Sequence, residues 1–197
     1  KRNINRLNFQ NLNSKFKIVS CSNIYPNKRI ELIIKALENI DLDLTWHHYG
    51  GFTNSTTDDY KSLINKEIKK LNQKGKIKGR MINREILLNM KKNKYDLFIN
   101  VSRSEGLPVS IMEAFSLGIP VIATNVGGVN EIVINNYNGF LIDENISIKA
   151  LSEKISYFFK LKIHEVHFLK KNAFSTWEKK FNSEYNYKSF IEIVKDI

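Results

Sequence analysis

Short, continuous apolar runs alternate with amphipathic segments along most of the chain. Such runs are typical of strands buried on both faces, and they predict strands over residues 16–22, 42–49, 76–79, 97–101, 120–124 and 139–142. Between and after them, apolar residues recur at helical spacing and predict helices over residues 28–40, 57–73, 83–92, 109–117, 129–134, 147–160, 164–181 and 184–195. Repeated strand–helix–strand units indicate an α/β domain, with a parallel sheet covered by helices on both faces.

Polar residues at helix starts and the chain length refine this prediction. Asn83 and either Thr56 or Thr57 are the expected N-caps of two helices. A chain of 197 residues suits one domain, which we place at residues 16–197, including the C-terminal helices. Residues 1–15 are polar and rich in asparagine, so we expect a lead-in or linker there. Because the first residue is Lys1, we expect a fragment or a processed form.

The net charge of +11 raises the question of an anionic partner. The lysines lie mostly on predicted helix faces, and no RNA-binding or zinc-finger pattern accompanies them. We therefore expect no nucleic acid partner, and peripheral contact with an anionic membrane surface is the better use of the charge. The single cysteine, Cys21, lies in a predicted strand and indicates a reducing compartment. We therefore expect a cytoplasmic protein, and no apolar run is long enough to span a bilayer.

Residues that suit ligand binding follow several of the predicted strands. In a parallel sheet, ligands bind outside the carboxyl ends of the strands. The loops at these ends carry Lys28, the pair Gly50–Gly51, residues 79–82, residues 103–108 and the pair Gly127–Gly128. Glycines, a lysine and carboxylates therefore converge on one edge of the sheet. This convergence predicts a nucleotide-type pocket.

Glu105 and Glu113 flank a turn between the fourth strand and the helix that follows it. The free amides of a first helical turn bind anions, so two carboxylates beside them suit hydroxyl groups next to a diphosphate. A structural interpretation remains open, in which Pro108 only begins the helix and Glu105 only complements its dipole. Glu113 favours function, because its helix is otherwise apolar and would solvate a carboxylate poorly.

Other candidate sites are weaker. The Asp-x-Asp sequence at residues 41–43 precedes the second strand and so lies at the opposite edge of the sheet. His164 and His167 lack a third metal ligand, and one of His47 and His48 is expected to be a hydrogen-bonded core residue. The chain has no Gly-x-Gly-x-x-Gly after the first strand, no Walker motif and no Gly-x-Ser-x-Gly, which disfavours dehydrogenases, ATPases and hydrolases.

The segment from Ser104 to Gly128 reads SEGLPVSIMEAFSLGIPVIATNVGG. Its Glu-x₇-Glu pattern resembles the signature of glycosyltransferase family 4, the group 1 glycosyltransferases. Supporting matches are SNIYPNKRIELIIKAL at residues 22–37, Tyr49-Gly50-Gly51 and NGFLID at residues 138–143. The resemblance covers nearly everything after residue 15. It implies the Rossmann-like C-terminal half of a two-domain GT-B enzyme, which binds the donor, while a missing N-terminal domain would bind a glycan or lipid-linked acceptor.

The resemblance implies roles for individual residues. Glu105 and Lys28 would be catalytic, Glu105 at the donor sugar and Lys28 at the leaving diphosphate, while Glu113 would hold the ribose. The donor-binding positions near the diphosphate would be Gly106, Leu107, Val109 and Ser110, through their backbone amides. Gly79, Arg80 and Ile82 would contact the base, largely through the backbone.

One position departs from the family pattern. The family pairs the lysine with an arginine five residues earlier, and that position is Asn23 here. The phosphate clamp therefore lacks one expected charge, for which Arg29, Arg103 or the acceptor-side domain would have to compensate.

The resemblance also implies an activity: retaining transfer from a nucleotide-diphosphate sugar, without cofactor or metal, in polysaccharide biosynthesis. Residues 1–197 alone would be expected to bind nucleotide but to transfer little sugar to an acceptor without the other domain. Two alternatives remain, a sugar-nucleotide epimerase of similar build and a non-catalytic nucleotide-binding domain. The Glu-x₇-Glu motif disfavours the first, and the presence of both Glu105 and Lys28 disfavours the second.

Overall fold

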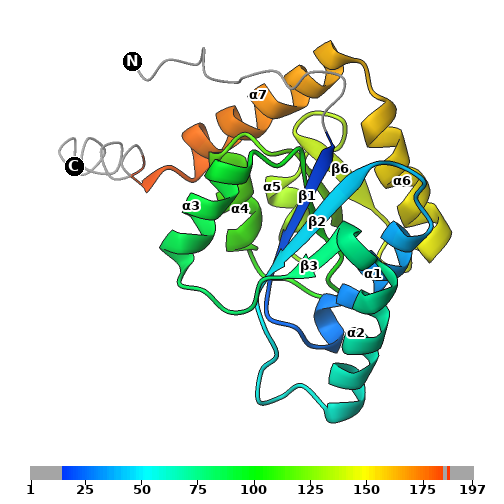
Figure 1. Cartoon of the computed structure of the whole chain (residues 1–197). Helices are drawn as coiled ribbons and strands as arrows, with labels where there is room; N and C mark the ends of the chain where they lie inside the picture. Colours follow the sequence, from blue (N-terminus) through cyan, green and yellow to red (C-terminus); the bar gives the residue numbers. More distant parts are fainter. Residues whose placement is uncertain (1–14, 184–185, 187–197) are drawn as a thin grey trace.

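The computed structural model describes residues 15–183 and residue 186. Within these residues, six strands form a single sheet (Figure 1). They are β1 (Phe16–Cys21), β2 (Leu44–Tyr49), β3 (Gly75–Ile77), β4 (Leu97–Asn100), β5 (Val121–Thr124) and β6 (Gly139–Ile142). Each neighbouring pair is parallel. The predicted parallel sheet is therefore confirmed.

The order of the strands in the sheet creates a switch point in its centre. The spatial order is β3-β2-β1-β4-β5-β6. The chain moves outward from β1 to β3 on one side, and then from β4 to β6 on the other. The connections that follow β1 and β4 therefore run toward opposite sides of the sheet, and the carboxyl ends of these two strands are where such sheets bind ligands. The predicted site residues Lys28 and Glu105 lie in these two loops.

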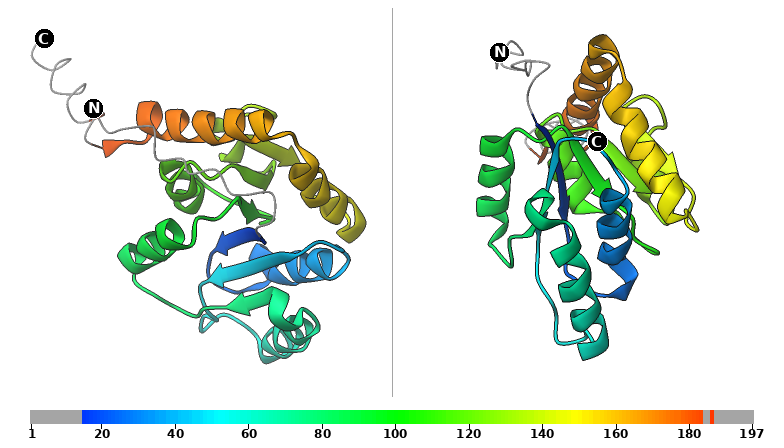
Figure 2. Two further views of the ribbon diagram at one scale, coloured as in Figure 1. Left: turned by 45° about the horizontal axis from the view of Figure 1, so that its top comes forward. Right: turned by 45° about the vertical axis from the view of Figure 1, so that its right-hand side comes forward.

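Helices cover both faces of the sheet (Figures 1 and 2). One face is packed by α1 (Ile30–Glu38), α2 (Asp58–Lys70) and α6 (Ile148–Lys160). The other is packed by α3 (Asn83–Asn93), α4 (Val109–Ser116) and the short α5 (Val129–Ile132). Short 3₁₀ turns occur at Pro26–Lys28 and Asn72–Lys74. This arrangement is the Rossmann-like α/β fold that the sequence predicts.

The last described helix, α7 (Ile163–Lys180), crosses the amino-terminal edge of the sheet (Figure 2). Its Leu169 belongs to the core on one face, whereas its Ala173 belongs to the core on the other. Between them, the Lys170 ammonium lies 3.4 Å from the carboxylate of Asp96, which directly precedes β4. Helix α7 thus lies at the edge opposite the predicted pocket.

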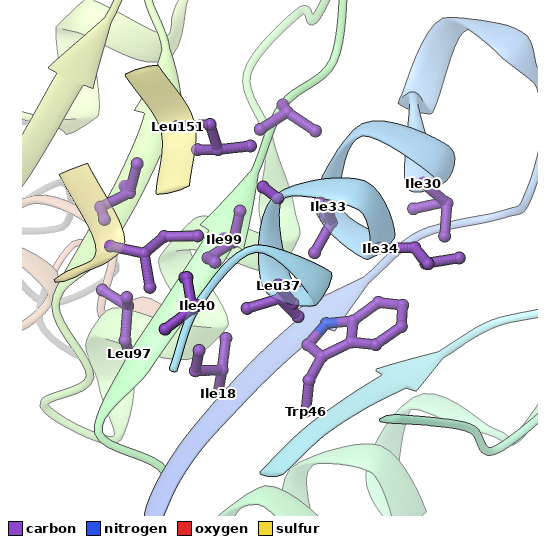
Figure 3. Packing of buried hydrophobic residues seen from close by; sticks show 14 of the residues in the cluster. Ile18, Ile30, Ile33, Ile34, Leu37, Ile40, Trp46, Leu97, Ile99 and Leu151 are labelled. Atoms are coloured by element: carbon purple, nitrogen blue, oxygen red, sulfur yellow. The ribbon is translucent and has the colours of Figure 1, made fainter. Parts of the chain in front are cut away.

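The two cores follow from the alternation of side chains along each strand. Ile18 and Ile99 join the core under α1, while their neighbours Val19 and Phe98 join the core on the opposite face. Figure 3 shows the first core, where α1 packs its apolar side chains against β1, β2 and β4. Because both faces are covered, β4, β5 and β6 are largely apolar along their length, which explains their continuous apolar runs.

The structure corrects several predicted boundaries. Helix α1 begins at Ile30 rather than residue 28, because the preceding residues form a 3₁₀ turn and Arg29 adopts a left-handed backbone with φ of 48°. Thr57 caps α2 as predicted, its hydroxyl accepting from the Tyr60 amide. The predicted cap Asn83 is wrong: Ile82 occupies the cap position and Asn83 is the first helical residue. The helix predicted over residues 184–195 lies outside the described residues, apart from residue 186.

A buried polar chain connects β1 and β2, and it includes the predicted core histidine. The Trp46 indole donates to the Ser20 hydroxyl at 3.0 Å, and this hydroxyl lies 2.9 Å from Nδ1 of His48. Nε2 of His48 lies 3.0 Å from the carbonyl oxygen of Ser22. Since a carbonyl only accepts, Nε2 carries the proton and Ser20 donates to Nδ1. His48 is therefore satisfied as a neutral ring, and burial lowers its pKa to about 4.

This environment makes us expect that His48 contributes to acid lability. The unfolded chain takes up this proton near pH 6.5, but the folded chain does so only near pH 4. Between these values the unfolded state binds more protons, so the free energy of unfolding falls as the pH drops from 6.5 to 4. The loss is on the order of 3 kcal/mol, from the difference in pKa.

Chemical denaturation at several pH values, comparing the wild type with His48→Gln, measures this contribution. We expect the variant to be less stable at pH 7 and to lose less stability on acidification. The exposed residue His164 provides the control, since His164→Gln should keep the wild-type slope. Equal slopes for the wild type and His48→Gln would contradict the assignment.

Candidate functional site

The candidate site lies at the switch point, where the loops after β1 and β4 are joined by hydrogen bonds. The Arg103 amide donates to the Asn27 carbonyl oxygen at 2.8 Å, and the Asn27 side-chain amide donates to the Ser104 carbonyl oxygen at 3.0 Å. These contacts place Lys28 beside Glu105. The Lys28 ammonium lies 2.7 Å from Oε1 of Glu105, and their side chains are only 16% and 11% exposed. The structure therefore brings the two predicted catalytic residues together.

Glu105 accepts hydrogen bonds that keep it ionised. Besides Lys28, the side-chain amide of Asn100 donates to the same oxygen at 3.1 Å. Burial alone would raise the pKa of Glu105, but hydrogen bonds from Lys28, Ser102 and Asn100 outweigh it and hold this pKa below its usual value. Sequence reasoning missed Asn100 and Ser102. Their only sequence signal is their place at the carboxyl end of β4, where a polar residue interrupts an apolar run.

Arg29 holds the loops beneath the site rather than facing the crevice. It is 5% exposed, and its guanidinium donates to the carbonyl oxygens of Val101 at 2.5 Å and Glu144 at 2.6 Å. Burial lowers its pKa. Since these carbonyls occupy the guanidinium, the idea that Arg29 compensates for Asn23 is wrong. Asn23 and Arg103 are both exposed, so Arg103 remains the arginine of the site that is open to a ligand.

The start of α4 provides open backbone amides. The amide of Ile111 donates to the Pro108 carbonyl oxygen at 3.0 Å and begins the hydrogen bonding of the helix. The amides of Val109 and Ser110 precede this bond and point out of the helix start. Leu107 and Val109 are 48% and 61% exposed, and Gly106 is exposed. The predicted amide positions are therefore accessible next to Glu105, and free amides at a helix start are suited to an anion.

Glu113 lies about one turn into α4 and faces the start of α3. The side-chain amide of Asn83 donates a hydrogen bond to its carboxylate. Asn83, predicted only as a cap, thus bridges the two helices. Cys21, at the end of β1, has its pKa raised to about 12 by burial and then by the charge of Glu113. A thiol that stays protonated is not a nucleophile, so Cys21 is a structural residue of β1.

The loop predicted to contact a base follows β3. Gly79 has φ of 78°, and its carbonyl oxygen accepts from the Gly50 amide at 3.0 Å. The guanidinium of Arg80 donates to the Phe52 carbonyl oxygen at 2.8 Å, while Ile82 is 65% exposed. The hydrogen bonds join this loop to the one after β2, at the same edge of the sheet as Glu113.

Three further points concern the Asp-x-Asp sequence, metal-binding side chains and membrane-spanning helices. The carbonyl oxygen of Asp43 accepts from the Phe16 amide at the start of β1, so the Asp-x-Asp sequence does lie at the amino edge of the sheet. Among the residues that the structure describes, no group of three or more His, Cys, Asp or Glu side chains is arranged to hold a metal ion. No helix within the same residues is long and apolar enough to cross a bilayer.

Comparison with known proteins shows the family of the chain. The family model of the glycosyl transferases group 1 matches residues 3–176. The uncharacterized glycosyltransferase MJ1178 of Methanocaldococcus jannaschii is 33% identical over 130 residues, which cover 66% of this chain and 34% of that protein. The Vi polysaccharide biosynthesis protein VipC/TviE of Salmonella typhi is 45% identical over 51 residues, or 26% of this chain and 9% of that protein.

Solved structures show the same fold. The crystal structure of Anabaena Alr3699/HepE in complex with UDP and glucose superimposes with a TM-score of 0.79 at 22% identity, and covers 93% of this chain and 49% of that one. The chain thus spans about half the length of this structure and about a third of its relative from M. jannaschii. With a family model that matches most of its length and a Rossmann-like sheet shared with GT-B glycosyltransferases, the chain belongs to the group 1 glycosyl transferases.

Proposed function

We propose that the chain binds the donor of a retaining glycosyltransferase, and that this donor is a nucleoside-diphosphate sugar. The supporting observation is the Lys28–Glu105 pair at the switch point, beside the open amides of α4. A cation and helix amides suit a diphosphate. A carboxylate held next to them suits sugar hydroxyls.

The residues divide the donor between them. In this proposal Glu113 binds the ribose and Glu105 the hydroxyls of the sugar. Lys28 and the amides at the start of α4 bind the diphosphate, together with Asn23 and with Arg103 as a second cation. The loop of Gly79, Arg80 and Ile82 contacts the base, which agrees with its place at the same edge of the sheet.

The chemistry follows from where charge develops. The bond between the anomeric carbon and the diphosphate oxygen breaks, and its electron pair leaves with the diphosphate. Lys28 and the helix amides stabilise this negative charge, while the Glu105 carboxylate stabilises the positive character of the sugar. The acceptor hydroxyl attacks the same face of the sugar and passes its proton to the departing phosphate. Because Lys28 and the amides supply the positive charge, we propose that this transfer proceeds without a metal.

The whole enzyme would use an acceptor bound outside the described residues. Since the chain spans about half of a related structure, we propose that residues 1–197 bind the donor but transfer little without a second domain. Relatives in polysaccharide biosynthesis support a glycan or lipid-linked acceptor. The free Cys21 supports a cytoplasmic location, and the net charge of +11 supports peripheral contact with an anionic membrane.

We expect selective binding of one nucleoside diphosphate, and weaker binding in the Glu113→Ala variant. Isothermal calorimetry on the 197-residue chain, with a panel of nucleoside diphosphates and their sugar derivatives, measures both. Loss of hydrogen bonds between the ribose and a carboxylate should weaken binding by about 10-fold or more. Glu85→Ala is the matched control, because Glu85 is an exposed carboxylate in the first turn of α3, and it should bind like the wild type.

The outcomes separate the competing functions. If no nucleotide binds to the chain, the proposal fails. Conversion of a nucleotide sugar to its epimer by the full-length protein, without an acceptor, would favour the epimerase. Nucleotide binding with no transfer by the full-length protein to any acceptor would favour the non-catalytic domain.

A further inference from the structure

We propose that Asn100 is a positioning residue, which holds the carboxylate of Glu105 toward the donor sugar when Lys28 moves to the diphosphate. This inference rests on the proposed function and adds a residue to its machinery. It derives from the arrangement of three side chains, one from β4 and one from each of the two loops at the switch point.

The orientation of the Asn100 amide is fixed by the backbone. Asn100 is the last residue of β4 and is 8% exposed. Its Oδ1 accepts from the Ser102 amide at 3.0 Å. Because a backbone N–H only donates, the group that it meets must be the carbonyl end of the side chain. The NH₂ end of Asn100 therefore faces Glu105, 3.1 Å from Oε1.

Lys28 and Asn100 share one oxygen of Glu105. The Lys28 ammonium approaches Oε1 to 2.7 Å, and the Asn100 amide approaches the same atom to 3.1 Å. A diphosphate competes with Glu105 for the ammonium. When Lys28 turns to the diphosphate, the buried carboxylate loses its cation, and a buried charge without partners is costly. The side chain of Asn100 belongs to a central strand and stays in place, so it continues to hold Glu105.

The choice of an amide at this position has a chemical reason. Lys28 is the cation that faces Glu105. The other side chains that donate hydrogen bonds to Glu105, Ser102 and Asn100, are neutral. An aspartate at position 100 would have nearly the same shape but would place a second carboxylate about 3 Å away. Two carboxylates so close disfavour ionisation of both. Asn100→Asp should therefore make Glu105 harder to ionise. An uncharged substitution that only changed the shape of the side chain would not have this effect.

The test is a double-mutant cycle in the full-length enzyme, with Asn100→Ala, Glu105→Gln and the double variant. We expect Asn100→Ala to lower kcat about 10-fold or more, since it removes a hydrogen bond to a charged group. The Kd for the nucleoside diphosphate alone, which lacks the sugar, should change by less than about twofold. In the Glu105→Gln background, Asn100→Ala should have little further effect, because the two residues act as one unit.

The pH profile supplies a second measurement. In Asn100→Asp the acid limb of the profile of kcat against pH should move to higher pH. Asn138→Ala should lower stability but leave this acid limb at the same pH. Asn138 is the matched control, a buried asparagine that bonds Ile132, Ile134 and Thr176.

Two results would overturn the role of Asn100 while nucleotide binding and transfer by the wild type stand. One is that Asn100→Ala lowers kcat by the same factor in the wild-type and Glu105→Gln backgrounds. The other is that the acid limb of the kcat profile stays at the same pH in Asn100→Asp. A wild type without nucleotide binding would instead overturn the proposed function itself.

Discussion

Replacement of Lys28 by alanine should lower transfer by about 10²–10³ in the full-length enzyme, the scale of losing one donor to a developing negative charge. The structure places this ammonium at the switch point, 2.7 Å from Glu105, on a side chain that is 16% exposed. In a site with so little water, a fixed cation stabilises charge more strongly than it would at the surface. The effect should appear in kcat, because the diphosphate gains an additional negative charge as its bond to the sugar breaks.

Steady-state kinetics with the donor varied, together with thermal melting, would measure the effect. Lys92→Ala is the matched control, because Lys92 is an exposed lysine in the last turn of α3, and it should transfer sugar like the wild type. Melting is needed because Lys28→Ala removes the cation from a buried carboxylate. Unchanged turnover in a folded Lys28→Ala variant would remove Lys28 from the mechanism.

The sequence was sufficient to predict which loops meet. Continuous apolar strands that alternate with helices are typical of a parallel sheet, which brings their carboxyl ends to one edge. Lys28 after the first strand and Glu105 after the fourth could therefore be assigned to one crevice from the strand pattern and the Glu-x₇-Glu motif. The structure places the two side chains in direct contact. The roles of Lys28 and Glu105 in binding and catalysis stay predictions.

The supporting contacts could not be predicted, because they depend on register and on backbone direction. Arg29 is a charged residue beside a helix start, and nothing local indicates that its guanidinium meets carbonyl oxygens 72 and 115 positions away. Asn83 has the composition of a cap, but its side chain turns to Glu113 on another helix. Asn100 interrupts an apolar strand, and only the turn at Ser102 fixes which end of its amide faces Glu105.

These contacts also limit which cations of this chain could bind the diphosphate together with Lys28. Asn23 stands where the resemblance to the family implies an arginine, and Arg29 is held by carbonyl oxygens. Arg103 is exposed, and its backbone amide is tied to Asn27, directly before Lys28. A second cation from this chain would therefore come from the loop after β4 rather than from the loop after β1, which is where the family has it.

Gly127→Ala should damage both the fold and the site. Gly127 follows β5 and has φ of 50°, and a Cβ at this residue would lie 1.8 Å from the carbonyl oxygen of Glu105. The next amide, that of Gly128, donates to the Gly106 carbonyl oxygen at 3.1 Å. The loop after β5 thus packs directly beneath the loop that carries the candidate catalytic carboxylate. An alanine would be strained at this φ and would push Glu105 away from Lys28.

We expect Gly127→Ala to lower the free energy of unfolding by about 1–3 kcal/mol and transfer by about 10²-fold, since a shift near 1 Å at a reacting group has this effect. Denaturation and steady-state kinetics measure the two. Gly106→Ala is the stability control, because a Cβ at Gly106 would meet nothing within 4 Å. Wild-type stability in Gly127→Ala would show that the loops separate without cost. Lowered stability with wild-type transfer would show instead that the position of Glu105 does not limit the reaction.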